Sequence, residues 1–103
     1  MSDTLERLYQ TIESRRDADP KTSYTAQLLI NGTPAIIAKI TEETGEMVRA
    51  ALNEGKVRLI AESADLLYHL LVLWAAEGVK PNEVWAELTK REGTSGIEEK
   101  RRR

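Results

Sequence analysis

Two short acidic clusters, set among apolar residues, constrain this chain more than any other feature. They are Glu42-Glu43-x-x-Glu46 and Glu62-x-x-Asp65. Carboxylates are rarely buried without a partner, and residues three or four apart share one face of a helix. If the two segments are antiparallel helices, five carboxylates converge with fewer cations nearby. Such a group suits a hard divalent cation, and Mg²⁺ commonly works together with substrate phosphates. The pattern therefore predicts a metal-dependent enzyme acting on a phosphate ester or anhydride.

The composition indicates a helical protein and argues against several classes of function. The chain has 103 residues, 41% of them apolar and 31% charged, which suits one soluble domain. The absence of Phe and the many Leu, Ala and Glu residues favour helix over sheet. A net charge of −2 argues against a nucleic-acid or membrane-surface binder, and the lack of cysteine excludes thiolate sites. The first residues show no secretory signal, so we expect a cytoplasmic protein.

Apolar spacing and helix-ending residues predict five helices and no strands. Leu and Ile at three- and four-residue spacing indicate the first helix, and proline or glycine separates the later ones. Thr33 is expected to cap the third helix, with Pro34 in its first turn. The expected ranges are 3–16, 23–32, 33–55, 56–77 and 81–91.

The fold class expected is an all-α helical bundle completed by homodimerisation. Residues 66–76 are apolar on nearly every face of their helix, yet this stretch is too short to span a bilayer. A chain of this length offers too few helices to surround that segment, and a second copy would supply them. We expect one helical domain over residues 1–92, followed by a polar, charged tail over residues 93–103.

Several cations and one histidine accompany the acidic clusters. Lys39 can pair with Glu42 or Glu43 at helical spacing, and Arg58 precedes Glu62 by four residues. His69 follows Asp65 by four residues, so it either orients Asp65, contacts a substrate phosphate or serves as a hydrogen-bonded core residue.

A proline-containing loop after the first helix carries further positive charge. Arg15, Arg16 and Lys21 flank this loop, where mobility and cations suit a polyanionic substrate. Solvated helix ends are the alternative interpretation. The candidate phosphate-binding residues are Arg15, Arg16, Lys21, Lys39 and His69.

Longer segments around these residues resemble a known family. The EExxE and ExxD pair resembles the all-α, MazG-like nucleoside triphosphate pyrophosphohydrolases, and the flanking segments resemble the phosphoribosyl-ATP pyrophosphohydrolases among them. Those segments are Glu13-Ser14-Arg15-Arg16 with Asp19-Pro20, Ser23-Tyr24-Thr25-Ala26, Asp65-Leu66-Leu67-Tyr68-His69 and Gly93-Thr94-Ser95-Gly96. The carboxylates indicate only the superfamily, whereas the flanking segments are more specific.

The resemblance implies a reaction and roles for the acidic residues. It implies Mg²⁺-dependent hydrolysis of the α–β phosphoanhydride of phosphoribosyl-ATP to phosphoribosyl-AMP and pyrophosphate, the second step of histidine biosynthesis. Glu43, Glu46, Glu62 and Asp65 would hold the Mg²⁺, and Glu42, Glu43 and Glu46 would be the catalytic group. Glu42 would either hold a second ion or accept the proton of the attacking water.

One departure keeps a second interpretation open. Gly45 stands where the family often has a larger residue, which brings the segment nearer to general MazG-like sequences. The runner-up function is a house-cleaning nucleoside triphosphate pyrophosphohydrolase, and a third is a non-catalytic helical interaction module. The expected partners are a small-molecule substrate and a second copy of the chain, with neither nucleic acid nor membrane.

Overall fold

A computed structural model describes residues 3–103, apart from the side chain of Glu99. The predicted domain begins at residue 1, so its first two residues lie outside the described part. Helices and connecting turns make up the described residues, without a strand, which confirms the all-α prediction. The elements are α1 (Asp3–Ser14), α2 (Tyr24–Asn31), α3 (Thr33–Arg49), η1 (Ala50–Glu54), α4 (Lys56–Glu77), α5 (Pro81–Arg91) and α6 (Gly96–Arg102).

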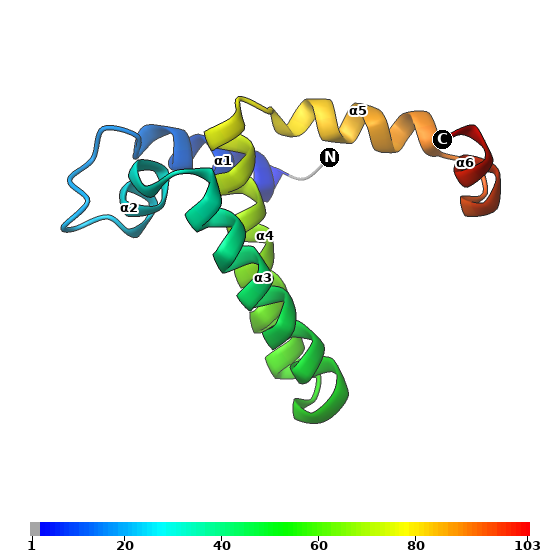
Figure 1. The fold of residues 1–103 in the computed structure, drawn as a ribbon, viewed down its shortest axis with the longest axis horizontal. Coiled ribbons are helices and arrows are strands. Elements are labelled where there is room, and N and C mark those ends of the chain that lie inside the picture. The colour runs from blue at the N-terminus through cyan, green and yellow to red at the C-terminus, as the bar shows by residue number, and fades with distance from the viewer. Residues whose placement is uncertain (1–2) are drawn as a thin grey trace.

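The two longest helices, α3 and α4, form an antiparallel hairpin that extends away from the other helices (Figure 1). The third helix was expected to continue to residue 55, but its α-helical part ends at Arg49. A π-helical turn, η1, follows, and the Gly55 amide donates to the Ala50 carbonyl at 3.2 Å. Gly55 has φ 88°, a conformation that favours glycine and allows the chain to reverse into α4.

The ends of the helices agree with the sequence in most places. The Ser23 side chain accepts from the Ala26 amide at 3.1 Å and caps α2, whose expected range began at this residue. Gly78 ends α4 with φ 73°. The expected cap at Thr33 is wrong, because Gly32 holds that position and Thr33 is already helical. The Thr33 hydroxyl instead donates to the Glu77 carboxylate and ties the start of α3 to the end of α4.

The hydrophobic core lies at the end of the hairpin where α1 and α2 pack. It consists of Ile12, Leu28, Ile36, Leu71, Val72 and Ala75, contributed by four helices. Long-range polar contacts support it, because the Tyr9 hydroxyl donates to the Val79 carbonyl at 2.9 Å and Arg16 donates to the Ala75 carbonyl. This core fixes one end of α3 and α4, and the acidic residues lie farther along the hairpin.

The C-terminal part is attached to the body through α5. The Trp85 indole donates to Glu6 at 2.9 Å, and its ring meets Trp74 edge-on with centroids 5.9 Å apart. Beyond α5, the expected polar tail contains a short helix, α6, whose first turn is capped by Ser95 accepting from the Glu98 amide at 3.0 Å. The sequence analysis did not predict this helix.

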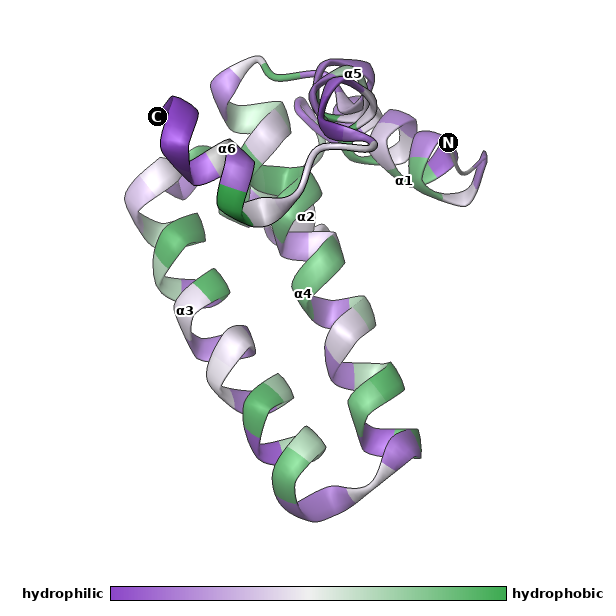
Figure 2. Cartoon of the chain, turned by 90° about the vertical axis from the view of Figure 1, so that its right-hand side faces the viewer, coloured by the Kyte–Doolittle hydropathy of each residue, from purple (hydrophilic) through white to green (hydrophobic). Residues whose placement is uncertain are grey.

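Apolar residues lie along the hairpin toward its tip (Figure 2), and many of the large ones are exposed. Leu52 is 74% exposed, Val57 80% and Ile60 64%. By length and composition α4 could cross a membrane, but core helices of soluble proteins satisfy the same criterion. Only 28% of its most apolar window is buried within one chain, so much of its surface is available for a partner.

Candidate metal and substrate site

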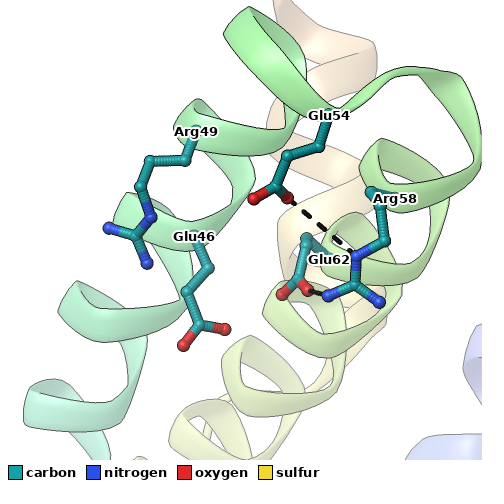
Figure 3. A pocket seen from close by; sticks show the side chains of 5 residues that line it. All are labelled: Glu46, Arg49, Glu54, Arg58 and Glu62. Carbon is teal, nitrogen blue, oxygen red and sulfur yellow. Dashed lines mark hydrogen bonds and ion pairs between the residues drawn. The ribbon is translucent and has the colours of Figure 1, made fainter.

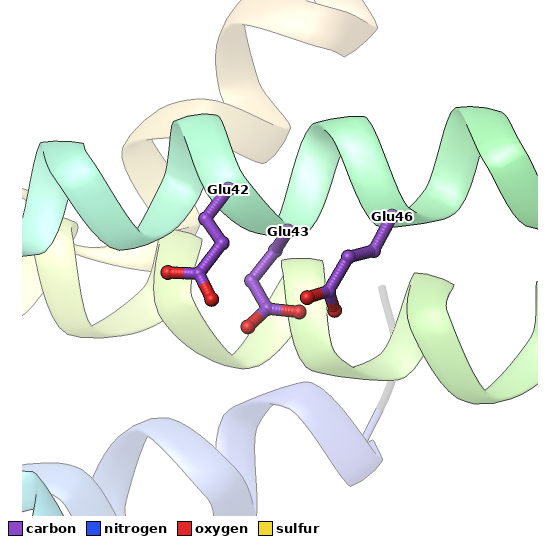
Figure 4. A group of neighbouring side chains, drawn as sticks. All are labelled: Glu42, Glu43 and Glu46. Atoms are coloured by element: carbon purple, nitrogen blue, oxygen red, sulfur yellow. The ribbon is translucent and has the colours of Figure 1, made fainter.

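The hairpin brings the two acidic clusters together. Glu42, Glu43 and Glu46 project from α3 toward α4 (Figure 4), and Glu62 and Asp65 come from α4. One carboxylate oxygen from each member of Glu42, Glu43 and Glu46 lies within 4.8 Å of the others. The same limit holds for Glu43, Glu62 and Asp65, so Glu43 belongs to both groups. The predicted convergence of five carboxylates is therefore present in the fold.

Two of these carboxylates are buried and incompletely paired. Glu43 is 8% exposed and Glu62 is 4% exposed. The Oε2 atom of each is buried and has no hydrogen-bond partner within the described part of the chain. A buried charged oxygen without a partner is costly, so these two atoms indicate that the site is built for a ligand that supplies positive charge.

Crowding of the acidic groups favours their protonated forms. Burial raises the pKa of Glu43, and the adjacent Glu46 carboxylate raises it further. Burial also raises the pKa of Glu62, again with Glu46 acting in the same direction, while Arg58 lowers it. Glu46 thus lies close enough to act on both buried carboxylates. The catalytic role that the resemblance implies for Glu46 stays a prediction.

Cations compensate only part of this negative charge. Lys39 pairs with Glu42 at 3.1 Å, one of the two pairings expected for it. Arg58 contacts the Oε1 atom of Glu62 and lies 4.0 Å from Glu54 (Figure 3). Arg58 thus pairs with Oε1 of Glu62, and Oε2 is left without a hydrogen-bond partner among the described residues.

A polar pocket opens beside the buried carboxylates. Its volume is about 200 Å³, and its lining residues are Glu46, Arg49, Glu54, Arg58 and Glu62. Two groups of three carboxylates that share Glu43, together with the unpartnered Oε2 atoms of Glu43 and Glu62, fit a hard divalent cation such as Mg²⁺. The two arginines could at the same time contact phosphate oxygens, because guanidinium groups bind phosphate in a bidentate manner.

Gly45 has no close neighbour that requires a glycine. A Cβ atom at this position would lie 3.8 Å from Nη1 of Arg49, an ordinary van der Waals contact. The glycine is therefore tolerated within α3 rather than required for close helix packing.

His69 is a buried, hydrogen-bonded residue, as one of the three interpretations proposed. Its Nδ1 atom lies 2.8 Å from the Asp65 carbonyl oxygen, and its Nε2 atom lies 3.0 Å from the Tyr24 hydroxyl on α2. Because a carbonyl only accepts, Nδ1 carries the proton and Nε2 accepts from Tyr24. Both ring nitrogens are engaged, so a substrate phosphate would have to displace Tyr24 to reach His69.

The loop cations lie away from the carboxylates. Arg16 pairs with Glu13 at 2.9 Å and also donates to the Ala75 carbonyl. Ala75 is ten residues beyond Asp65 on α4, which is about 15 Å along the helix axis. Arg15 and Lys21 are exposed in and beside the loop between α1 and α2. Among the predicted phosphate-binding residues, only Lys39 and His69 lie beside the acidic groups.

Tyr24, like Arg49 and Glu54 of the pocket, lies near the site, although reasoning from the sequence assigned it no role there. It entered the sequence analysis only as part of the Ser-Tyr-Thr-Ala segment, without a role. A tyrosine directly after a helix-capping serine is a weak signal, and only the fold shows that it contacts His69.

An all-α hairpin gathers five carboxylates around two buried oxygens that have no partner within the described residues, and this arrangement is typical of proteins whose acidic helices could hold a hard divalent cation. Comparison with known families identifies one family of all-α proteins. The chain belongs to the phosphoribosyl-ATP pyrophosphohydrolase family, whose sequence model matches residues 5–92.

Curated relatives agree with the family assignment. A phosphoribosyl-ATP pyrophosphatase from Paramagnetospirillum magneticum is 58% identical over 99% of this chain and 94% of its own length. One from Azospirillum brasilense is 54% identical over 96% of this chain and 89% of its own length. A third, from Granulibacter bethesdensis, is 55% identical over 93% of this chain and 60% of its own, longer length.

Proposed function

We propose that this protein hydrolyses the α–β phosphoanhydride of phosphoribosyl-ATP and releases phosphoribosyl-AMP and pyrophosphate, the second step of histidine biosynthesis. Family membership and the names of the close relatives support the substrate. The observation that carries the chemistry is the pair of buried, unpartnered Oε2 atoms of Glu43 and Glu62. A purely structural protein would have no reason to bury them beside further carboxylates.

We propose Mg²⁺ as the metal, held by Glu43, Glu46, Glu62 and Asp65. When bound, it would supply positive charge to the phosphate oxygens and to the charge that develops in the transition state. Two observations support this set of metal ligands. One oxygen each of Glu43, Glu62 and Asp65 lies within 4.8 Å of the others. Glu46 acts electrostatically on both buried glutamates.

Other side chains of the site would orient the reactants. Glu42 is exposed and lies at the edge of the cluster, where its carboxylate can accept the proton of an attacking water. The ammonium group of Lys39 pairs with Glu42 at 3.1 Å and can contact a substrate phosphate instead. Arg49 and Arg58 border the pocket and can bind the departing pyrophosphate.

A substrate panel tests this proposal. The purified chain is assayed for pyrophosphate release from phosphoribosyl-ATP and from ATP, dCTP and dUTP, with Mg²⁺ and with excess chelator. We expect metal-dependent turnover with a kcat/KM for phosphoribosyl-ATP well above that for the plain triphosphates. Preference for a plain triphosphate would instead identify a house-cleaning enzyme. No metal-dependent turnover of any of them would leave a non-catalytic module.

We also propose that the protein acts in the cytoplasm as a homodimer. Exposed apolar residues follow the hairpin on α3, η1 and α4, among them Val48, Leu52, Val57 and Ile60. A second copy that presents the same face would cover them in a two-fold interface, the commonest arrangement of soluble oligomers. The polar acidic groups of the same helices make a lipid environment an unfavourable alternative.

A further inference from the structure

The side chain of Tyr24 is held rigidly at its polar end. Its hydroxyl donates to Nε2 of His69 at 3.0 Å, and His69 is 5% exposed. The His69 ring is fixed in turn by the Asp65 carbonyl at 2.8 Å. Partial burial raises the pKa of Tyr24, so its hydroxyl remains the donor in this hydrogen bond. The orientation of the ring is therefore set before any ligand arrives.

The Tyr24 ring nevertheless presents a large free surface. It stacks on Tyr68 with centroids 6.2 Å apart and an interplanar angle of 24°, and it meets His69 edge-on at 5.8 Å. Tyr24 still remains 46% exposed. An aromatic side chain that is packed on one side, fixed at its hydroxyl and nearly half exposed as a residue is arranged to receive another flat group.

The location of this ring connects it to the acidic site. His69 bonds to the backbone of Asp65, one of the grouped carboxylates, and the charges of Lys39, Glu43 and Glu42 act on Tyr24. The ring therefore lies where a ligand with its phosphates at the carboxylates would extend its nonpolar end. Its surroundings are charged, in contrast to the apolar tip of the hairpin around Leu52 and Val57.

We propose that Tyr24 is the stacking platform for the adenine base of the substrate. This role rests on the proposed function, because it assumes a nucleotide whose phosphates occupy the acidic site. A base can stack on an aromatic ring without hydrogen bonds to its edges, and the face of the Tyr24 ring can serve for such stacking. Tyr24 would thus contribute to substrate binding, while the carboxylates supply the chemistry.

Paired ligands that differ only in the base provide the test. Binding of AMP and of ribose 5-phosphate is measured by calorimetry with Mg²⁺ for the wild type and for Tyr24→Leu, Tyr24→Phe and Ile30→Ala. We expect Tyr24→Leu to weaken AMP binding at least about fivefold, with ribose 5-phosphate binding unchanged. Tyr24→Phe should recover most of the lost affinity, because it retains the ring. Ile30→Ala alters an exposed residue of the same helix and should keep the wild-type difference in affinity between AMP and ribose 5-phosphate.

Kinetics give a second readout. With phosphoribosyl-ATP, Tyr24→Leu should raise KM by a factor similar to the loss of AMP affinity while kcat changes less. An equal loss of affinity for AMP and ribose 5-phosphate would overturn the platform and indicate that Tyr24 only positions His69. Dissociation of an oligomer by Tyr24→Leu, with the base preference intact, would overturn it in favour of a protein contact.

The two proposals fail in different ways. If the wild type does not hydrolyse phosphoribosyl-ATP, but Tyr24→Leu selectively weakens AMP binding, the proposed substrate is wrong and the stacking role of Tyr24 stands. If the wild type hydrolyses phosphoribosyl-ATP but binds AMP no more tightly than ribose 5-phosphate, the platform is overturned and the function stands.

Discussion

Glu43 on α3 and Glu62 on α4 place carboxylate oxygens within 4.8 Å of each other across the hairpin, and the Oε2 atom of each is buried without a hydrogen-bond partner among the described residues. Both groups have a raised pKa, chiefly because of burial and then because of Glu46. The metal-free hairpin therefore carries a local electrostatic penalty at neutral pH. This relationship leads to the first two predictions.

The metal-free protein should lose stability from these two groups as the pH rises. A raised folded-state pKa means that the native carboxyl keeps its proton after the unfolded chain has lost it, so the free energy of unfolding falls through this pH window. The window begins near the usual glutamate pKa of about 4.3. Urea unfolding at several pH values in chelator measures the effect. Glu43→Gln should flatten the decline, and an equally steep decline in that variant would contradict the assignment.

Mg²⁺ should offset this penalty and stabilise the protein more strongly at higher pH. Protons compete with the metal for carboxylates, and a ligand that binds only the folded state raises the melting temperature by mass action. Thermal melts with and without Mg²⁺ at pH 5.5 and 8 check the expectation. Glu77→Gln, which alters a carboxylate at the other end of α4, is the control and should keep the full response. A metal response of equal size in Glu43→Gln would contradict the site.

Glu46→Gln should abolish turnover and leave the helical fold intact. Glu46 acts on both buried glutamates, so its loss would remove a shared part of the proposed metal-binding group. Removing one of several crowded charges relieves repulsion, so the metal-free stability should hold or rise slightly. Pyrophosphate release at saturating Mg²⁺ and circular dichroism test the two halves. Hydrolysis at the wild-type rate would exclude Glu46 from catalysis.

Helical periodicity was sufficient to predict the hairpin and its acidic face. Residues at three- and four-residue spacing fall on one side of a helix in any context, so Glu43 and Glu62 could be placed opposite each other from the sequence. Gly55 and Gly78 marked two helix ends because glycine tolerates the conformations required there. These are local properties of the chain.

Contacts between distant segments could not be predicted in this way. Arg16 was expected to face a phosphate, but it contacts the Ala75 carbonyl across 59 residues. Thr33 was expected to cap a helix and instead contacts Glu77. The Tyr24–His69 hydrogen bond depends on how α2 packs against α4, which no local pattern determines. The π-helical turn η1 likewise follows no distinctive residue type.

Dimer formation should depend on the tip of the hairpin. Leu52 is 74% exposed, and Leu52→Glu would place a charge in the proposed interface. We expect sedimentation to show a dimer for the wild type and a shift toward monomer for the variant. The wild-type melting temperature should also rise with protein concentration. Ile97→Glu, at a 69% exposed position on α6, is the matched control and should remain dimeric. A compact monomer of the wild type at micromolar concentration would contradict the proposed dimer.

The paired arginines after α1 should separate into a substrate-binding residue and a structural one. Replacing Arg15 and Arg16 together with Ala is expected to raise KM for phosphoribosyl-ATP at least about tenfold, roughly 1.4 kcal/mol of binding, because the substrate carries a phosphate beyond its triphosphate. Arg16 already contacts Glu13 and the Ala75 carbonyl, so Arg16→Ala alone should lower stability by about 1 kcal/mol. Arg15 is exposed, so Arg15→Ala alone should carry most of the kinetic effect without a change in melting temperature.

Steady-state kinetics and thermal melts of the two single variants and the double variant, together with Mg²⁺ titration, distinguish these roles. Metal affinity should stay at the wild-type value, because neither arginine is among the grouped carboxylates or their ion-pair partners. An unchanged KM in Arg15→Ala with normal metal binding would show that both arginines are solvated or structural. The sugar phosphate would then have to be bound by other cations, such as Lys39 and Arg58, which pair with Glu42 and Glu62 of the acidic clusters.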